Sequence, residues 1–160
     1  MLTAHRLRKV LSYDPATGRF RWRVGGPGVR AGRVAGNTSG REGYYQIGVD
    51  RKLYQASRLA WLYMTGKWPK LQIDYINRNR CDTRWANLQQ VTPAQKRASA
   101  RTTSKLGVKG VWMIPGGKYA ARIKAAGKIT YLGSFDTIKE ASAAYAKAAK
   151  KAFGKFARAR

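Results

Sequence analysis

The chain of 160 residues contains 33 lysines and arginines against 7 aspartates and glutamates, so its formal net charge is +26. Because 44% of the residues are apolar and five are tryptophans, the sequence favours packed cores over a disordered basic tail, and no apolar run approaches the ~18 residues of a membrane span. The single cysteine, Cys81, excludes an internal disulfide and a cysteine-based zinc site, and the single histidine, His5, leaves few side chains for acid–base chemistry near neutral pH. Together with the high positive charge, this composition is typical of a soluble intracellular protein that binds a polyanion.

The positive charge extends along the whole chain. Residues 1–95 have a net charge of +12, residues 96–106 of +4 and residues 107–160 of +10. A surface that is charged only for solubility usually mixes both signs. We therefore expect a nucleic acid as partner, ahead of an anionic membrane surface or an acidic protein. The absence of a long basic amphipathic helix with a bulky apolar face disfavours the membrane.

In the first half of the chain, the residue pattern predicts short helices and strands that alternate with turns. The expected elements are a helix from Thr3 to about Leu11, a strand with Phe20 and Trp22, a glycine-rich loop over 25–43, a hairpin of 45–49 with 53–55, and a helix over 58–65. Ser57 is expected to cap the second helix, and Gly66 to end it. A polar turn region is expected to follow over 74–84.

In the second half, three strands and a helix are expected after a basic linker. The predicted elements are the linker over 96–106, strands over 107–112, 118–124 and 128–132, and a helix from a capping box of Thr137 and Glu140 to about Phe153, ended by Gly154. The small residues that should lie on the sheet are Ala141, Ala144, Tyr145, Ala148 and Ala152. The expected class is α+β, with a module over 1–95, the linker over 96–106, and a sheet-type domain over 107–160.

Residues 107–153 contain a dense set of positions typical of one known DNA-binding domain. The matching residues are Gly110-Val111, Gly117-Lys118-Tyr119-Ala120-Ala121, Ile123, Leu132-Gly133-Ser134-Phe135-Asp136-Thr137, Glu140-Ala141 and Ala144-Tyr145. On these positions the segment resembles the DNA-binding domain of plant ethylene-response factors (the APETALA-two type), which also occurs in phage and mobile-element nucleases. The resemblance implies that a three-stranded antiparallel sheet, packed on one helix, enters the major groove of duplex DNA.

The resemblance also implies which side chains contact DNA. On the exposed face of the sheet they are Lys109, Trp112, Arg122, Lys124 and Tyr131, and the linker adds Arg97, Arg101 and Lys105. The residues alone agree, because basic and aromatic side chains interleave on short strands. Where the family commonly has arginine the chain has Trp112, which disfavours base readout by a bidentate arginine there. The structural alternative is that Trp112 and Tyr131 only cover the hydrophobic edge of the sheet.

Residues 44–95 contain a second set of familiar positions. They are Arg58-Leu59-Ala60-Trp61, Gly66, Trp68-Pro69, Ile73-Asp74, Ile76-Asn77, Asp82, Arg84-Trp85-Ala86-Asn87-Leu88 and Thr92, joined upstream by Tyr13-Asp14-Pro15, Thr17-Gly18, Phe20 and Trp22. On these positions the chain resembles the HNH homing endonucleases of phages. The resemblance implies a small ββα-metal-like nuclease module, in which two strands and a helix surround one metal ion.

Four positions depart from that family. Its general base, a histidine that activates the attacking water, is replaced by Tyr75, and a phenol with a pKa near ~10 is a poor base at neutral pH. A second histidine and an asparagine are replaced by Ser57 and Thr83. The asparagine that helps to hold the divalent metal is replaced by Lys96, whose ammonium group cannot bind a cation.

Two residues of the family's site are retained. They are Asp74, the family's metal carboxylate, and Asn87, which in the family supports the active-site loop. Asp74 with Asp82 leaves weak Mg²⁺ binding through waters open, and no other cofactor is expected. Neither His5, which lies on a polar helix far away in sequence, nor Tyr75, which would need its own activating base, is expected to supply the lost chemistry. Since base and metal activate the same attack, the losses favour an inactive protein without deciding the matter.

The predicted function is therefore that of a duplex-DNA-binding protein derived from an HNH endonuclease and favoured to be catalytically inactive. It would act by occupying sites on DNA, as a phage regulator or counter-defence factor. Two alternatives stay open: an active metal-dependent homing or nicking endonuclease, and an inhibitor that binds a host protein or nucleoprotein complex. The expected location is the cytoplasm of a bacterial host. The sequence sets no oligomeric state.

Overall fold

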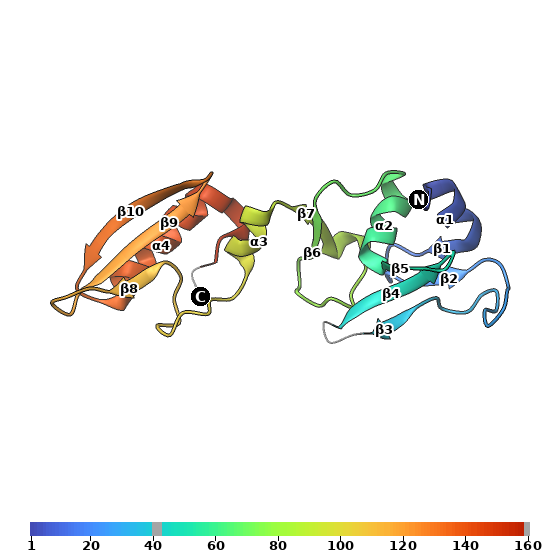
Figure 1. The fold of residues 1–160 in the computed structure, drawn as a ribbon, viewed down its shortest axis with the longest axis horizontal. Helices are drawn as coiled ribbons and strands as arrows, with labels where there is room; N and C mark the ends of the chain where they lie inside the picture. The colour runs from blue at the N-terminus through green and yellow to red at the C-terminus, as the bar shows by residue number, and fades with distance from the viewer. Residues whose placement is uncertain (40–42, 159–160) are drawn as a thin grey trace. The chain divides into compact units, whose positions relative to one another are not determined.

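The computed structural model describes residues 1–39 and 43–158 and contains helices together with several small antiparallel sheets (Figure 1). The α+β class expected from the sequence is confirmed. Contacts between residues divide the chain into two compact units, Met1–Val91 (unit 1) and Thr92–Arg160 (unit 2). Among the described residues, none of the helices has the length and apolar character needed to cross a membrane.

The described residues of unit 1 form three small antiparallel sheets and two α-helices. Its elements are α1 (Ala4–Val10), β1 (Leu11–Tyr13), β2 (Phe20–Trp22), β3 (Asn37–Ser39), β4 (Tyr44–Val49), β5 (Lys52–Gln55), α2 (Ala56–Thr65), β6 (Gln72–Tyr75), the 3₁₀ turn η1 (Trp85–Asn87) and β7 (Leu88–Val91). The sheets pair β1 with β2, β3 with β4 and β5, and β6 with β7. Their apolar sides, with α1 and α2, form one core around fully buried Phe20, Ile47 and Leu59.

The start of α2 differs from the sequence prediction. The helix begins at Ala56, and its N-cap residue Gln55 makes no side-chain capping hydrogen bond. Ser57, expected as the cap, lies inside the first turn and is only 1% exposed, because this turn of the helix packs against the core of unit 1. The helix ends as predicted at Gly66, whose φ of 75° is a left-handed conformation that glycine adopts without a steric penalty.

The region expected as a polar turn contains a strand at its beginning. Asp74 and Tyr75 lie in β6, where they pair with Gln89 and Leu88 of β7. This pairing joins residues more than ten positions apart, so a local reading of the polar sequence could not reveal it. The expected turn therefore begins only after Tyr75.

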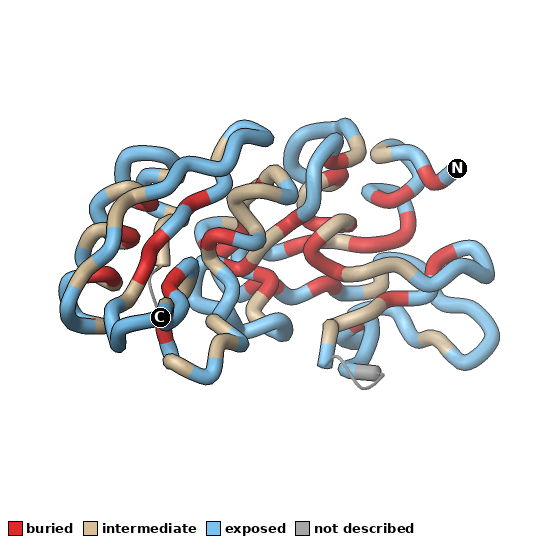
Figure 2. Tube along the Cα trace, turned by 60° about the vertical axis from the view of Figure 1, so that its left-hand side comes forward, coloured by how far each residue is buried: buried red, intermediate tan, exposed pale blue. Residues whose placement is uncertain are grey.

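Unit 2 contains one antiparallel sheet with a long helix against one of its faces. Its elements are α3 (Pro93–Ser99), β8 (Val111–Met113), β9 (Tyr119–Ala125), β10 (Lys128–Phe135), α4 (Ile138–Phe153) and the 3₁₀ turn η2 (Gly154–Phe156), and the strand order is β10-β9-β8. The expected capping box of Thr137 and Glu140 opens α4. Buried residues recur along β9 and α4 (Figure 2), so the core of unit 2 lies between the sheet and this helix.

The small residues of α4 face the sheet in a slightly different register from that predicted. Ala141, Tyr145 and Ala149 are buried, at successive positions four residues apart. Ala144 is half-buried and Ala152 is exposed. In the last turn it is Phe153 that packs against the core in place of Ala152.

Part of the segment expected as a linker belongs to helix α3. A capping box in which Thr92 and Gln95 bond reciprocally opens this helix, which then continues to Ser99. Contacts accordingly divide the chain between Val91 and Thr92, upstream of the boundary drawn at residue 95. Whether the expected domains fold independently stays a prediction.

Candidate functional site

The sheet of unit 2 has one face against α4 and one open face. Along β9, buried Ala121 and Ile123 alternate with exposed Arg122 and Lys124, as the two-residue period of a strand requires. Tyr131 of β10 lies across from Arg122 in the register and is 59% exposed. The chain therefore presents cations and an aromatic ring side by side on the open face.

Three of these side chains form a cluster that we call the aromatic platform: Trp112, Arg122 and Tyr131. The guanidinium carbon of Arg122 lies 5.2 Å from the centre of the Trp112 ring, a cation–π distance. The ring centres of Trp112 and Tyr131 are 6.5 Å apart, and Trp112 is 36% exposed. Aromatic rings beside a guanidinium group suit stacking on bases and pairing with phosphates.

β10 contains an irregularity next to the platform. The register of its pairing with β9 shifts between Tyr131 and Gly133. The two-residue period of a strand places Tyr131 on the open face, while its neighbour Leu132 packs against the core. Because the shift comes only after Tyr131, the platform lies on the regularly paired part of the two strands.

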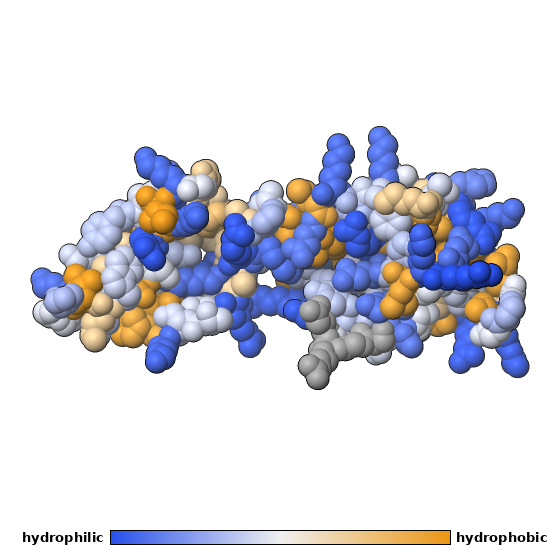
Figure 3. All heavy atoms as spheres, viewed as in Figure 1, coloured by the Kyte–Doolittle hydropathy of each residue, from blue (hydrophilic) through white to orange (hydrophobic). Residues whose placement is uncertain are grey.

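The acidic side chains of unit 2 are engaged away from the platform. Asp136 Oδ1 lies 3.0 Å from Lys118 Nζ, and the Glu140 carboxylate accepts from the backbone of Thr137 in the cap of α4. Strongly hydrophilic side chains cover much of the visible surface of each unit (Figure 3). The open face of the sheet is therefore left with a local excess of positive charge.

The remaining residues expected to contact DNA differ in their surroundings. The Lys109 ammonium donates to the carbonyl oxygens of Arg97 at 3.1 Å and Ala98 at 2.6 Å, so it binds the last turn of α3. Arg97, Arg101 and Lys105 are exposed. Lys109 thus has a structural role that the sequence did not indicate, and the other three stay predicted DNA contacts.

The positions that resemble a nuclease site lie mostly in unit 1. Tyr75 is 4% exposed and Ser57 is 1% exposed, and among the described residues neither hydroxyl has a hydrogen-bond partner. Burial raises the pKa of Tyr75 above its ordinary value, and the nearby Ser57 hydroxyl opposes that shift only in part, without reaching hydrogen-bond geometry. At neutral pH the Tyr75 side chain is therefore a protonated phenol that is shielded from water.

Thr83 connects two distant loops of unit 1. Its hydroxyl donates to the carbonyl oxygen of Gly18 at 2.6 Å, and its own carbonyl oxygen accepts from the Tyr13 hydroxyl at 2.6 Å. Gly18 has a φ of 73°, and a Cβ there would lie 2.4 Å from the Arg84 nitrogen. The close approach of the two loops thus requires glycine at 18 and makes Thr83 a structural residue.

Asn87 and Asp82 organise the loop that follows β6. The Asn87 side chain accepts from the Asn77 nitrogen at 2.9 Å and donates to the Asp82 carbonyl oxygen at 2.8 Å. The Asp82 carboxylate accepts from Arg84 Nη2 at 2.6 Å, and this pairing lowers the pKa of Asp82 to about 2. The Asp82 side chain is therefore committed to holding the loop.

Asp74 is the retained carboxylate of the metal site that the resemblance implies. Asp74 is half-buried on β6, and no group of three or more His, Cys, Asp or Glu side chains within residues 1–39 and 43–158 could hold a metal ion. Lys96, the expected replacement for a metal ligand, lies on α3 in unit 2. Its ammonium group offers no lone pair to a cation, so the residue at this position does not fit the metal that the resemblance implies.

Comparison with known families gives a partial match. Residues 54–98 match the family model of the HNH endonucleases. This HNH segment contains α2, β6, β7 and most of α3. Six positions compared with that family in the sequence analysis fall within it: Ser57, Asp74, Tyr75, Thr83, Asn87 and Lys96. No curated protein is similar enough to match the chain.

The chain is also similar to solved structures. One of them is that of the HNH homing endonuclease I-HmuI, described for its DNA binding and cleavage. The similarity has a TM-score of 0.42 and 16% sequence identity, and covers 89% of this chain and 84% of that chain.

Proposed function

We propose that the protein binds duplex DNA through the open face of β8, β9 and β10, and that it does not cleave the DNA it binds. The observation that supports this proposal most is the aromatic platform, which includes exposed Arg122 and is joined on the same strand by exposed Lys124. A two- or three-stranded sheet fits the major groove of B-DNA, which is about 12 Å wide. Arginine and lysine side chains on such a face would pair with phosphates while the rings contact the base edges and sugars.

The proposed lack of cleavage rests on where the polar groups of unit 1 lie. A general base must reach the attacking water through a hydrogen bond, and it must be able to accept a proton. Tyr75 meets neither condition, because it is 4% exposed and burial raises its pKa. Lys96, which stands where the resemblance implies a metal-binding asparagine, carries an ammonium group that cannot ligate a cation.

Such a protein would act by occupying DNA. A phage protein that keeps the DNA-binding part of an endonuclease can block a site, regulate a gene or oppose a host defence without cutting. The proposal places this action in the cytoplasm of a bacterial host.

Binding of a fluorescent duplex by the full chain, followed by anisotropy, tests the proposed interface. The double variant Arg122→Gln with Lys124→Gln is expected to weaken binding at least tenfold, since both side chains would face the DNA. The matched control is Lys147→Gln with Lys151→Gln, two exposed lysines of α4, which removes the same charge. Equal losses in the two variants would contradict a defined interface on the sheet.

Nuclease activity is the second candidate function, because residues 54–98 match the HNH endonucleases and Asp74 is retained. It predicts nicking that depends on a divalent metal and disappears in Asp74→Ala. Association with a host nucleoprotein complex, the third hypothesis, predicts a pull-down that survives nuclease treatment.

A further inference from the structure

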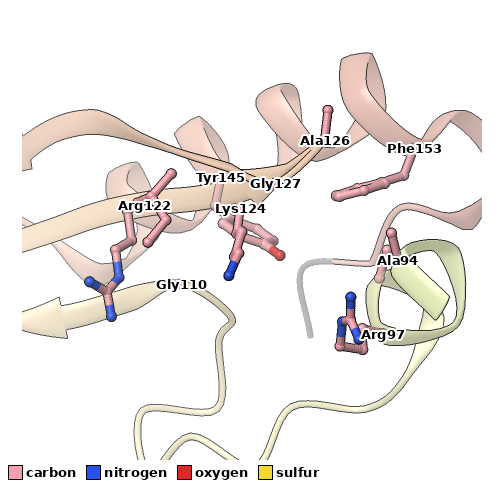
Figure 4. A pocket seen from close by; sticks show the side chains of 11 residues that line it. Ala94, Arg97, Gly110, Arg122, Lys124, Ala126, Gly127, Tyr145 and Phe153 are labelled. Carbon is pink, nitrogen blue, oxygen red and sulfur yellow. The ribbon is translucent and has the colours of Figure 1, made fainter.

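Unit 2 contains a pocket of about 390 Å³ next to the open face of its sheet (Figure 4). The side chains that matter for its chemistry are Arg97, Arg122, Lys124, Ile129, Tyr145 and Phe153. The volume lies within the range of about 300–1,000 Å³ that is usual for small-molecule sites. The pocket is therefore large enough for a ligand with both a ring and a charged group.

The pocket exists because β8 is shorter than β9. The carbonyl oxygen of Gly110 accepts from the Arg122 nitrogen at 2.8 Å, just before β8 begins. Past this point β9 continues to Ala125, and the described residues place no strand along that edge. Lys124 therefore lies where the edge of the sheet is open.

Glycine is required at position 110, where the backbone that borders the pocket packs closely against β9 and Tyr145. Gly110 has a φ of 63°, and a Cβ there would lie 2.3 Å from the Arg122 carbonyl oxygen and 2.6 Å from the Tyr145 ring. Any other residue would displace that ring or the strand. The backbone thus passes directly over Tyr145, which is 8% exposed.

The side chains around the pocket combine positive charge with aromatic surface. Arg122 and Lys124 extend from β9 and Arg97 extends from α3, while the Phe153 ring enters from the end of α4 (Figure 4). The residues that line it include no aspartate or glutamate. Burial raises the pKa of Tyr145, so its hydroxyl stays a hydrogen-bond donor at neutral pH. This chemistry suits one phosphate and one planar ring, which together make a nucleotide.

Arg122 belongs to both the pocket and the aromatic platform. A DNA strand whose bases contact Trp112 and Tyr131 would therefore bring its next nucleotide to the pocket. Inside a perfect duplex every base is stacked and paired, so none can enter a pocket without being extruded. We propose that this pocket binds a single unpaired nucleotide of DNA held on the platform, so that the protein prefers DNA with a bulge or gap to perfect duplex. The inference rests on the proposed DNA binding and adds a substrate class to it.

The test compares the affinity of the full chain for three labelled DNAs: a perfect duplex, the same duplex with a one-nucleotide bulge, and one isolated strand. The bulged duplex is expected to bind about tenfold more tightly than the perfect duplex, the effect of one base gaining an aromatic stacking partner. Phe153→Leu should remove this preference and leave affinity for the perfect duplex unchanged. Because Phe153 is partly buried, the exposed residue Arg97 provides a second variant, Arg97→Gln, with Arg101→Gln as matched control because Arg101 does not line the pocket. Both variants should weaken binding of the perfect duplex to a similar extent, and only Arg97→Gln should also reduce the preference for the bulged duplex.

Equal affinity of the native chain for bulged and perfect duplex would overturn the inference while leaving the proposed function intact. The proposed function fails separately, if none of the three DNAs binds. Deoxyadenosine monophosphate, added as a competitor, tests whether the pocket binds a free nucleotide as well as it binds a nucleotide within a DNA strand. Displacement of the bulged duplex at micromolar concentrations of this nucleotide would contradict a requirement for the strand, whereas persistence of the complex supports it.

Discussion

Two regions of the molecule differ in whether their polar side chains are exposed to solvent. They are the open face of β8, β9 and β10 in unit 2 and the region of α2 and β6 in unit 1 that contains Ser57 and Tyr75. On the open face, Arg122 and Tyr131 are exposed and directed to solvent, where a partner can reach them. In unit 1 the hydroxyl groups of Ser57 and Tyr75 are buried, and among the described residues neither has a hydrogen-bond partner. The difference teaches that the fold leaves the polar groups of the open face accessible to a partner and removes the Ser57 and Tyr75 hydroxyls from solvent.

The largest expected effect is the salt dependence of DNA binding. If the protein neutralises about 6–10 phosphates, its affinity should fall by about 10³–10⁵ between 50 and 200 mM salt. Arg122→Gln with Lys124→Gln should reduce the log–log slope by about two, because each phosphate contact contributes about 0.9. Anisotropy titrations at several salt concentrations measure the slope.

The control for that experiment lies in unit 1. Lys67→Gln with Lys70→Gln removes two exposed lysines and is expected to leave the slope unchanged. A flat salt response of the native chain would contradict binding through phosphate contacts. A larger change in the control variant would contradict the assignment of DNA binding to unit 2.

A charge in the core of unit 2 should unfold the open face together with the sheet. Ala141 is fully buried between α4 and the sheet, so Ala141→Asp would bury an unpaired carboxylate at a cost above about 4 kcal/mol. Chemical denaturation followed by circular dichroism measures the change. Ala143→Asp, at an exposed position of the same helix, should be tolerated, and similar losses in both variants would show that α4 does not pack as described.

Loss of the Thr83 hydroxyl should loosen unit 1 without affecting DNA binding. Thr83→Val leaves the Gly18 carbonyl oxygen without its 2.6 Å donor, which is expected to cost about 1–3 kcal/mol of the free energy of unfolding. Thr38→Val, at an exposed position of β3, serves as control and should change stability by less than about 0.5 kcal/mol. Denaturant midpoints of the two variants would coincide if Thr83 had no structural role.

The smallest effects separate two buried tyrosines. The Tyr13 hydroxyl donates at 2.6 Å to Thr83, so Tyr13→Phe should cost about 1 kcal/mol. The Tyr75 hydroxyl has no partner among the described residues, so Tyr75→Phe should be neutral or slightly stabilising. Thermal unfolding compares the two, and a clear loss of stability in Tyr75→Phe would reveal a partner for that phenol.

The elements that could be predicted from the sequence are those that local patterns determine. The strand alternation around Arg122 and the capping box of Thr137 and Glu140 depend on residues close together in the chain, so the sheet and α4 follow from the sequence. The same kind of pattern opens α3, where Thr92 and Gln95 stand three residues apart. That signal was present, but the basic composition of 96–106 led to the expectation of a linker.

What could not be predicted depends on contacts between distant residues. The pairing of β6 with β7 places Tyr75 in the core, and the docking of the 14–18 turn on Thr83 explains why threonine occupies position 83. The pocket of unit 2 likewise joins α3, the open edge of β9 and the end of α4. The sequence pattern around Tyr145 predicts only that it lies on the helix face that packs on the sheet. Most of its ring is indeed buried there, and the pattern gives no indication that Tyr145 also lines a pocket.

One measurement tests the central claim most directly: DNA binding and plasmid nicking of the native chain, measured side by side with and without Mg²⁺ or Mn²⁺. At a protein concentration that saturates the DNA, the account predicts a fully bound plasmid that stays supercoiled in either metal. Nicking that requires the metal and disappears in Asp74→Ala would contradict the account and show that the protein is a working endonuclease.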